Sequence, residues 1–533
     1  MAESVGTRAL VRLDLRLDRL RLGLLIGGLA AFVAMVCSSF DSLYPEAADR
    51  QSFAADMSAS GAIRAFYGTV YGTSIGALTA WRSSGMTAIA ALVAMFLVVR
   101  HTRGDEESGR RELLGATVVG RQAPLVATLV VALAAYVVLA AAITLVLLAL
   151  GQPFAGSLAL GLAFAGMGWV FAGVAAVAAQ LTVSSRTANG IAAAVLAVAA
   201  LLRMGGNAAD ANGGSAPWPV WLSPMGWADQ VRPFAGNHWW VLILFVVATA
   251  VLVAAALVLS TRRDVGGGLL PTRPGPAAGA SWLRSPVALA WRLQWGSLLA
   301  WAVGLGVFGA VIGGVAKSAA DVVRDNPDLA DMIERLGGKG VISDAFLAGS
   351  IGFLGVAAAG CGIQAALRLR GEETSERAEP VLATSVPRLR WAGSHFVFAF
   401  VGPAVAMLVA GVAAGVAYGL SLGDGLDQVG RVLAGALVQL PAVWVMAGVA
   451  ILLIGAFPRW SSASWLALIA VIVILFVADL IDGAQWLKDL SPFTHIPKVP
   501  GGSVQALPLV LLTTVAAALS TTGIEALRRR DLG

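Results

Sequence analysis

Charged residues are scarce in this chain. Asp, Glu, Lys and Arg make up 13% of its 533 residues, whereas a soluble domain carries about 25%. Hydrophobic residues make up 58%, and the mean hydropathy is +0.80. These values exclude an ordinary soluble globular protein. They predict an all-α protein that crosses a membrane many times.

Cysteine and histidine are nearly absent as well. Cys37 and Cys361 are the only cysteines, and both lie in or beside apolar stretches, so no disulfide framework is expected. The four histidines are scattered along the chain without the spacing of metal ligands, and we therefore expect no metal site. They are His101, His238, His395 and His495.

The chain also lacks a nucleotide-binding motif. Gly338-Lys339 is its only Gly-Lys pair, and it has neither the earlier glycine nor the following Ser or Thr of a P-loop. No Asp, Glu or His relay within the apolar runs is evident, nor a cluster of catalytic polar residues. We therefore expect no enzymatic activity and no cofactor in this chain. If it transports, it needs an external motor or a gradient.

Long apolar runs, in contrast, are abundant. A helix needs about 20 apolar residues to cross a hydrocarbon core of roughly 30 Å. The runs predict twelve spans in two sets of six, at 22–39, 84–100, 123–150, 157–181, 187–203, 239–260, 295–316, 347–367, 393–420, 430–456, 463–481 and 506–522. We interpret 1–260 as the first half, the Gly/Pro-rich segment 261–280 as a cytoplasmic linker and 281–533 as the second half.

The positive charges predict the orientation of the spans. Of the 37 Lys and Arg, 25 fall in loops on the side of the two termini. Cytoplasmic loops carry an excess of Lys and Arg, so both termini are expected in the cytoplasm of a cell whose plasma membrane holds the protein. The net charge of +6 and the pI near 9.7 then reflect topology, and no nucleic-acid partner is expected.

One charged segment occurs twice, once in each half. Residues 103–121 read RGDEESGRRELLGATVVGR and residues 370–388 read RGEETSERAEPVLATSVPR, with ten of nineteen positions identical at an offset of 267. The offset indicates a tandem duplication, and an even number of spans per half makes the two repeats parallel. Both copies are predicted on the cytoplasmic side, where they would meet a partner with twofold symmetry.

The acids precede the basic residues in the first copy, which suits a helix from Asp105 to Val119. Glu106 and Arg110 are four residues apart, which favours a pair on one helix face. In the second copy Pro380 is expected to end or kink the helix near Glu379. The two copies are therefore expected to dock unequally, with the first copy the more regular. The alternative is a solvated positive-inside loop.

Each half opens with an amphipathic stretch. Within 8–23, Leu10, Leu13, Leu17 and Leu20 recur at helical spacing with arginines between them, and 281–296 carries three tryptophans in a similar pattern. Such stretches are typical of helices that lie in the membrane interface. The alternative is a simple positive-inside flank.

Three charges near the predicted outer ends of spans could form a pair between the halves. Arg203 ends the fifth span, and Asp479 and Asp482 end the eleventh. A charge near the membrane core costs about 3 kcal/mol on insertion scales, which favours pairing. Exposure at the outer boundary is the alternative.

The E-x-x-x-R-x-E core of both copies, after an interfacial helix and two spans, resembles the permeases of ABC-2-type exporters. The stretches 96–125, 222–240 and 490–502 are similar to actinobacterial exporters of polyketide antibiotics, the tetronasin type. The resemblance implies export of hydrophobic or amphiphilic compounds, driven by a separate ATPase, a homodimer that binds ATP and Mg. It also implies that the repeated segments are coupling helices, with Glu106, Arg110, Arg111, Glu112, Glu373, Arg377 and Glu379 facing the ATPase.

Two alternatives remain for the function. A gradient-driven secondary drug transporter of the major facilitator type has the same parallel six-plus-six arrangement. The loop from Gly104 to Arg111 lacks the Asp-Arg pair of that family, however. An ABC exporter of lipids would have a similar sequence.

Overall fold

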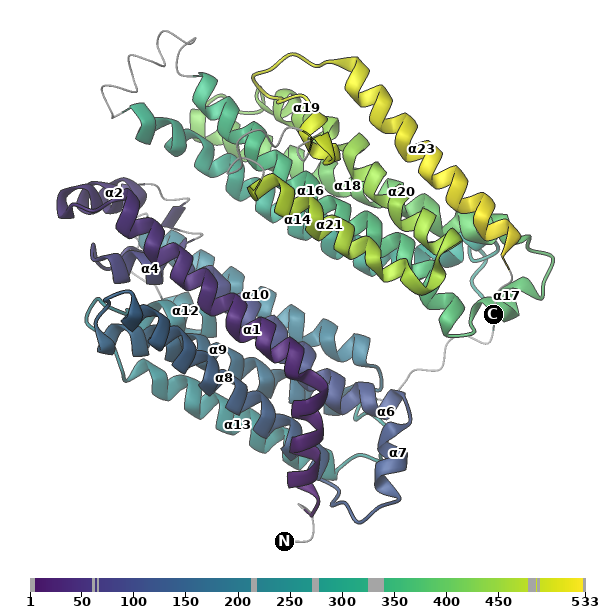
Figure 1. Ribbon diagram of the computed structural model, residues 1–533, viewed down its shortest axis with the longest axis horizontal. Coiled ribbons are helices and arrows are strands. Elements are labelled where there is room, and N and C mark those ends of the chain that lie inside the picture. The colour runs from purple at the N-terminus through teal and green to yellow at the C-terminus, as the bar shows by residue number, and fades with distance from the viewer. Residues whose placement is uncertain are drawn as a thin grey trace. The chain divides into compact units, whose positions relative to one another are not determined.

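The computed structural model describes residues 5–59, 63–64, 67–211, 218–270, 278–324, 340–477, 486 and 489–530. Every regular element in these ranges is a helix, which confirms the expected all-α class. In lipid each backbone N–H and C=O must find a hydrogen-bond partner inside the protein, and a helix supplies these partners within one segment. The chain divides into two compact units, Met1–Gly275 and Pro276–Gly533 (Figure 1).

Within the described ranges, eleven helical stretches are long and apolar enough to cross a membrane. Six belong to the first unit: Thr7–Leu43, Ile75–Glu107, Ala123–Ala149, Phe154–Leu181, Ser185–Asn207 and Val241–Thr261. Five belong to the second: Pro286–Gly314, Phe346–Thr374, Arg388–Leu422, Val429–Ala456 and Ala506–Arg529. The expected span 463–481 coincides with α21 (Ser464–Val477), and its last four residues lie outside the described part.

Helix α9 (Phe154–Leu181) is the centre of the first unit. It packs against α5 (Thr87–Val99), α8 (Ala123–Ala149) and α13 (Val241–Thr261), while α1 (Thr7–Leu43) packs on α8 (Figure 1). Small residues permit this close packing. A Cβ added at Gly168 would lie 2.2 Å from the Tyr136 ring of α8. Other helices of this unit are α2 (Ala47–Ala59), α4 (Ile75–Ser83), η2 (Ser84–Met86), α10 (Ser185–Ala211), α11 (Trp218–Trp221) and α12 (Pro224–Gln230).

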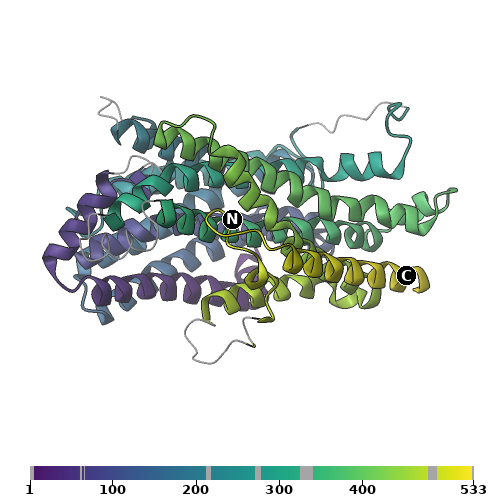
Figure 2. The same cartoon turned by 90° about the horizontal axis from the view of Figure 1, so that it is seen from above.

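The second unit is built around two helix pairs. Helix α14 (Pro286–Arg324) runs along α18 (Arg388–Leu422), where a Cβ at Gly313 would lie 2.0 Å from the carbonyl oxygen of Ala414. Helix α20 (Leu440–Ala456) packs against α23 (Ala506–Arg529) and α16 (Gly340–Thr374), and Figure 2 shows α23 beside the green helices of this unit. Its shorter elements are α17 (Ala378–Leu382), α19 (Val429–Val438), η4 (Pro458–Ala463) and η5 (Pro492–His495).

The N-terminal amphipathic stretch is the first part of α1 and continues into the span without a break. Figure 1 shows this part of α1 turned away from the rest of the helix. Leu10 is buried, but Leu13, Leu17 and Leu20 are exposed, and Leu20 is 72% exposed. Asp14 and Asp18 occupy the buried face instead, at i+4 spacing between Leu10 and Leu22. The second stretch, 281–296, likewise leads directly into α14, which begins at Pro286.

Candidate functional site

The first charged segment, 103–121, is two short helices at the end of a span. Helix α5 continues through a π-helical turn, η3 (Arg100–Gly104), into α6 (Asp105–Glu107), and α7 (Arg110–Gly115) follows. Gly109, between them, has a φ of 72°. A residue in the left-handed region ends a right-handed helix, so the expected continuous helix from Asp105 to Val119 is wrong.

The second charged segment, 370–388, breaks at the equivalent position. Helix α16 ends at Thr374, Glu376 has a φ of 57° and α17 begins at Ala378. Pro380 therefore lies in the first turn of α17, where no intrahelical N–H donor is needed. The expected end or kink near Glu379 is found instead at Glu376, and Pro380 does not cause it, because the chain turns at Glu376 and a new helix starts before the proline.

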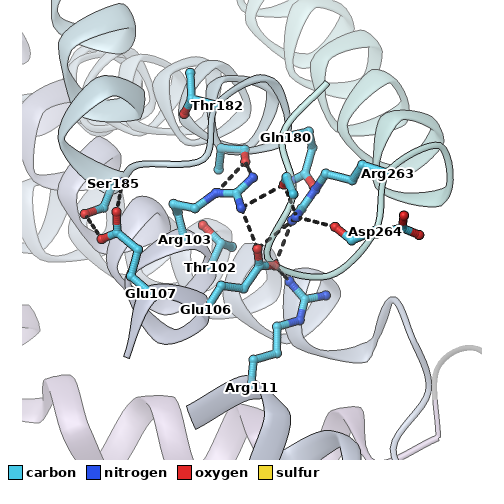
Figure 3. A network of polar contacts seen from close by, with 12 residues as sticks. Thr102, Arg103, Glu106, Glu107, Arg111, Gln180, Thr182, Ser185, Arg263 and Asp264 are labelled. Carbon is cyan, nitrogen blue, oxygen red and sulfur yellow. Dashed lines mark hydrogen bonds and ion pairs between the residues drawn. The ribbon is translucent and has the colours of Figure 1, made fainter. Parts of the chain in front are cut away.

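Glu106 is the centre of the contacts in the first segment (Figure 3). Its side chain is 1% exposed and accepts from Arg103 Nη1 at 2.7 Å, from Arg263 at 2.7 and 2.8 Å, and from Arg111. The expected pair of Glu106 with Arg110 is not formed. Arg110 instead contacts Asp105 at 3.4 Å, because the break at Gly109 turns it away from Glu106.

The same network fastens the segment to the ends of two spans. Arg103 donates to the Ala179 carbonyl at the end of α9, with Nη2 at 2.5 Å, and Arg263 Nε donates to Gln180 Oε1 at 2.7 Å. Both guanidinium groups also donate to the Gly267 carbonyl, at 3.0 and 2.9 Å (Figure 3). One carboxylate and several backbone carbonyls thus accept hydrogen bonds from three cations, of which Arg103 and Arg263 are buried.

Burial of the arginine charges opposes this anchoring, and helix capping adds to it. Burial, together with the charge of Arg263, lowers the pKa of Arg111 to about 10, and burial lowers the pKa of Arg263. Glu107 accepts from the backbone N–H of Ser185 at 2.8 Å and from its hydroxyl at 2.5 Å. A carboxylate at the N-terminus of α10 offsets the unpaired N–H groups and the dipole of that helix.

The second unit repeats the central contact at the same offset. Glu373 accepts from Arg370 at 2.8 Å and from Arg530 at 2.7 Å, as Glu106 does from Arg103 and Arg263. Each partner arginine follows the last helix of its unit by one or two residues. Its carbonyl in turn accepts from an arginine at the end of the segment: Arg121 Nη2 donates to Arg263 O at 2.5 Å and Arg388 Nη1 to Arg530 O at 3.2 Å.

Arg203 has a buried partner within the first unit. Its Nε donates to Asp229 of α12 at 2.6 Å, and its Nη2 donates to the Tyr67 carbonyl at 2.9 Å and to Ser84 Oγ at 3.0 Å. Burial raises the pKa of Asp229, and the charge of Arg203 opposes this. Asp479 and Asp482 lie outside the described residues, so their pairing with Arg203 stays a prediction.

Sequence reasoning missed a polar cluster at the buried face of α1. His101 lies against Asp18 and 3.4 Å from Asp14, and Arg100 donates to Asp18 at 2.7 Å. The sequence feature that could have revealed this cluster is the spacing of Asp14 and Asp18, which lie on the same helix face as Leu10 and Leu22. The leucine pattern of 8–23 pointed to a different face, that of Leu13, Leu17 and Leu20, which is exposed. No group of three or more His, Cys, Asp or Glu that could hold a metal ion occurs in the described part of the chain.

This chain is similar to a known multidrug efflux permease. The multidrug efflux system permease protein Rv1217c of Mycobacterium tuberculosis (strain ATCC 25618 / H37Rv) is 44% identical to this chain over 528 residues, which cover 99% of the chain and 95% of the relative. The chain belongs to this family of multidrug efflux permeases. Residues 283–528 also match the family model of the multidrug efflux system permease Rv1217c, C-terminal domain.

In this efflux permease the predicted coupling residues fall into two groups. Glu106, Arg111 and Glu373 are turned inward and hold the segments to their own helix bundles. The other four are exposed: Arg110, Glu112, Arg377 and Glu379. The side chain of Arg110 is 64% exposed. The inward group can position the segments, and the outward group is accessible to a partner protein.

Proposed function

We propose that the chain is the membrane-spanning subunit of an ATP-driven exporter of the ABC-2 type. It moves hydrophobic or amphiphilic compounds, including antibiotics of the polyketide class, out of the cell. A separate ATPase, bound as a homodimer, supplies the ATP and Mg sites. The name of the relative, a multidrug efflux system permease, and the absence of a P-loop from this sequence support this assignment.

The observation that carries the proposal is the repeated anchoring of the two charged segments. Glu106–Arg263 and Glu373–Arg530 fix each segment to the end of the last helix of its own unit. An exposed Arg and an exposed Glu follow each anchor along the chain. They are Arg110 and Glu112 on α7, and Arg377 and Glu379 at the start of α17. Two similar, rigidly held, outward-facing elements are what a dimer of identical ATPase subunits requires of its membrane partner.

We further propose twelve spans, arranged as two parallel repeats with both termini in the cytoplasm. The matched ion pairs at an offset of 267 support the repeat, and the distribution of arginine supports the orientation. The additional span would comprise α21 and the residues that follow it.

Cysteine accessibility tests this orientation. Ser281, where the second half begins, and Ser503, just before α23, are both exposed and are each changed to Cys in a chain without Cys37 and Cys361. Ser281→Cys is expected to react only from inside the cell and Ser503→Cys only from outside. An even number of spans in each half places both termini on the same side as Ser281, so the reverse labelling pattern would refute the orientation.

Transport by inside-out vesicles tests the energy source. The permease, produced together with its proposed ATPase subunit, is expected to concentrate ethidium when ATP is added, and orthovanadate is expected to stop this. Collapsing the proton gradient with nigericin and valinomycin is expected to have no effect. Uptake that needs the gradient and ignores vanadate would establish a secondary transporter instead and refute the ABC assignment.

A further inference from the structure

A cavity of about 230 Å³ opens between the first part of α1, the charged segment 103–121 and the start of α8. Its walls include Leu10, Leu13, Leu17 and Leu113, and its polar lining includes Asp14, His101 and Thr128. The three polar residues are at least nine-tenths buried. The combination of an apolar wall with a few buried polar groups is typical of small-molecule sites.

The Asp14 carboxylate, a buried polar group of this lining, has only long contacts. Its two contacts, with His101 Nδ1 and Thr128 Oγ1, are both 3.4 Å long. Asp18, one turn further along α1, accepts from Arg21 at 2.8 Å and Arg100 at 2.7 Å and also contacts His101. A buried carboxylate with long contacts retains capacity to accept a hydrogen bond, and a ligand with a donor would supply it.

The remaining charged groups at the cavity select the sign of the ligand. Asp105 and Arg110 also line it, in contact with each other at 3.4 Å, and the Arg110 side chain extends into solvent. His101 contacts Asp18 and also lies 3.4 Å from Asp14 and 3.8 Å from Asp105. At the buried end of the cavity an anionic head group would meet the Asp14 carboxylate, whereas a protonated amine would find there a carboxylate that can accept its N–H.

We infer that this cavity is a binding site for amphiphiles that carry a protonated amine. The ammonium N–H donates to Asp14 Oδ1 or Oδ2, and the apolar body lies against Leu10, Leu13 and Leu17. A volume of about 230 Å³ is smaller than a whole drug-sized site, roughly 300–1,000 Å³. Part of the ligand therefore remains on the exposed leucines, where a lipid-dissolved compound can reach it. The inference rests on the proposed export of amphiphilic compounds and names their chemical class.

Equilibrium binding to the purified full-length chain in nanodiscs tests the site without ATP or any ATPase. The probe is tritiated verapamil, a lipophilic tertiary amine that is protonated at pH 7. Asp14→Asn keeps the side-chain size and removes the charge, and we expect its affinity for verapamil to fall at least about tenfold. The quaternary N-methyl derivative has no N–H donor, and we expect it to bind wild type more weakly than verapamil does.

Two variants of α1 separate a blocked cavity from a disturbed helix. Leu17→Trp fills the cavity and is expected to abolish binding, whereas Leu20→Trp, on the same helix but not in the lining, is expected to leave it unchanged. Equal affinities in wild type, Asp14→Asn and Leu17→Trp would refute the inference. Loss of binding only in nanodiscs containing phosphatidylethanolamine would show that a lipid amine occupies the site, and would refute its role for exported compounds. The binding assay contains neither ATP nor an ATPase, so its outcome does not depend on the energy source. The vesicle assay can therefore refute the ABC assignment without refuting the binding site.

Discussion

Replacing Glu106 with Gln should release the first charged segment from the helix bundle. The carboxylate is 1% exposed and is the acceptor that Arg103, Arg111 and Arg263 share. Removing one partner of a buried ion pair costs about 3–5 kcal/mol, because the remaining charges stay buried and uncompensated. Helix α7 has little apolar anchoring to replace the ion pairs, since Leu113 is 76% exposed.

Amide hydrogen exchange across residues 103–121 measures this release directly. A loss of about 3 kcal/mol in the free energy of local opening corresponds to exchange roughly a hundredfold faster in Glu106→Gln. Glu112→Gln makes the same chemical change six residues away on the exposed side, so its exchange should match wild type. Equal exchange in Glu106→Gln and wild type would show that the segment is held by something other than the ion pairs.

Three further predictions concern the two charged segments. Arg530→Gln removes one of the two arginine partners of Glu373 and should uncouple ATP hydrolysis from transport. Arg528→Gln changes an exposed arginine nearby and should leave the coupling intact. Equal transport per ATP in the two variants would refute a positioning role for Arg530. Glu112→Arg should lower transport-coupled ATP hydrolysis more than Glu379→Arg does, because α7 is longer than α17 and is expected to be the stronger docking element for the ATPase. Equal losses in the two variants would rule out unequal docking. Glu376→Gly should raise the free energy of unfolding in SDS by about 1 kcal/mol, because glycine adopts the left-handed φ of 57° without steric cost; an unchanged value would place the strain elsewhere.

The spans were predictable because hydropathy is a local property. Each of the eleven stretches found overlaps an apolar run that is visible in the sequence, and a lipid environment leaves helices as the available answer for such runs. The ends were less predictable. Helix α1 absorbs the amphipathic stretch, and the break in each charged segment depends on one left-handed residue, Gly109 or Glu376. Glutamate at such a position carries no sequence signal.

The inward role of Glu106 was not predictable for a different reason. Local spacing offered Arg110 as its partner, but the arginine that follows the last helix, Arg263, is 157 residues away. In the same way Asp14 and Asp18 are on the charged side of a leucine pattern, yet packing against His101 turns them inward. Contacts of this kind depend on which helix ends meet, and periodicity along one helix does not contain that information.

The sequence by itself determined a helical membrane protein, its apolar spans and the duplication of a charged segment, because these follow from composition, run length and repetition along the chain. Only the tertiary structure decided which charges face inward. Burial of an ion requires a partner of opposite charge, and the partners of Glu106 and Glu373 come from the far ends of their units. Once those buried pairs have formed, four charged residues of the two segments stay exposed: Arg110, Glu112, Arg377 and Glu379.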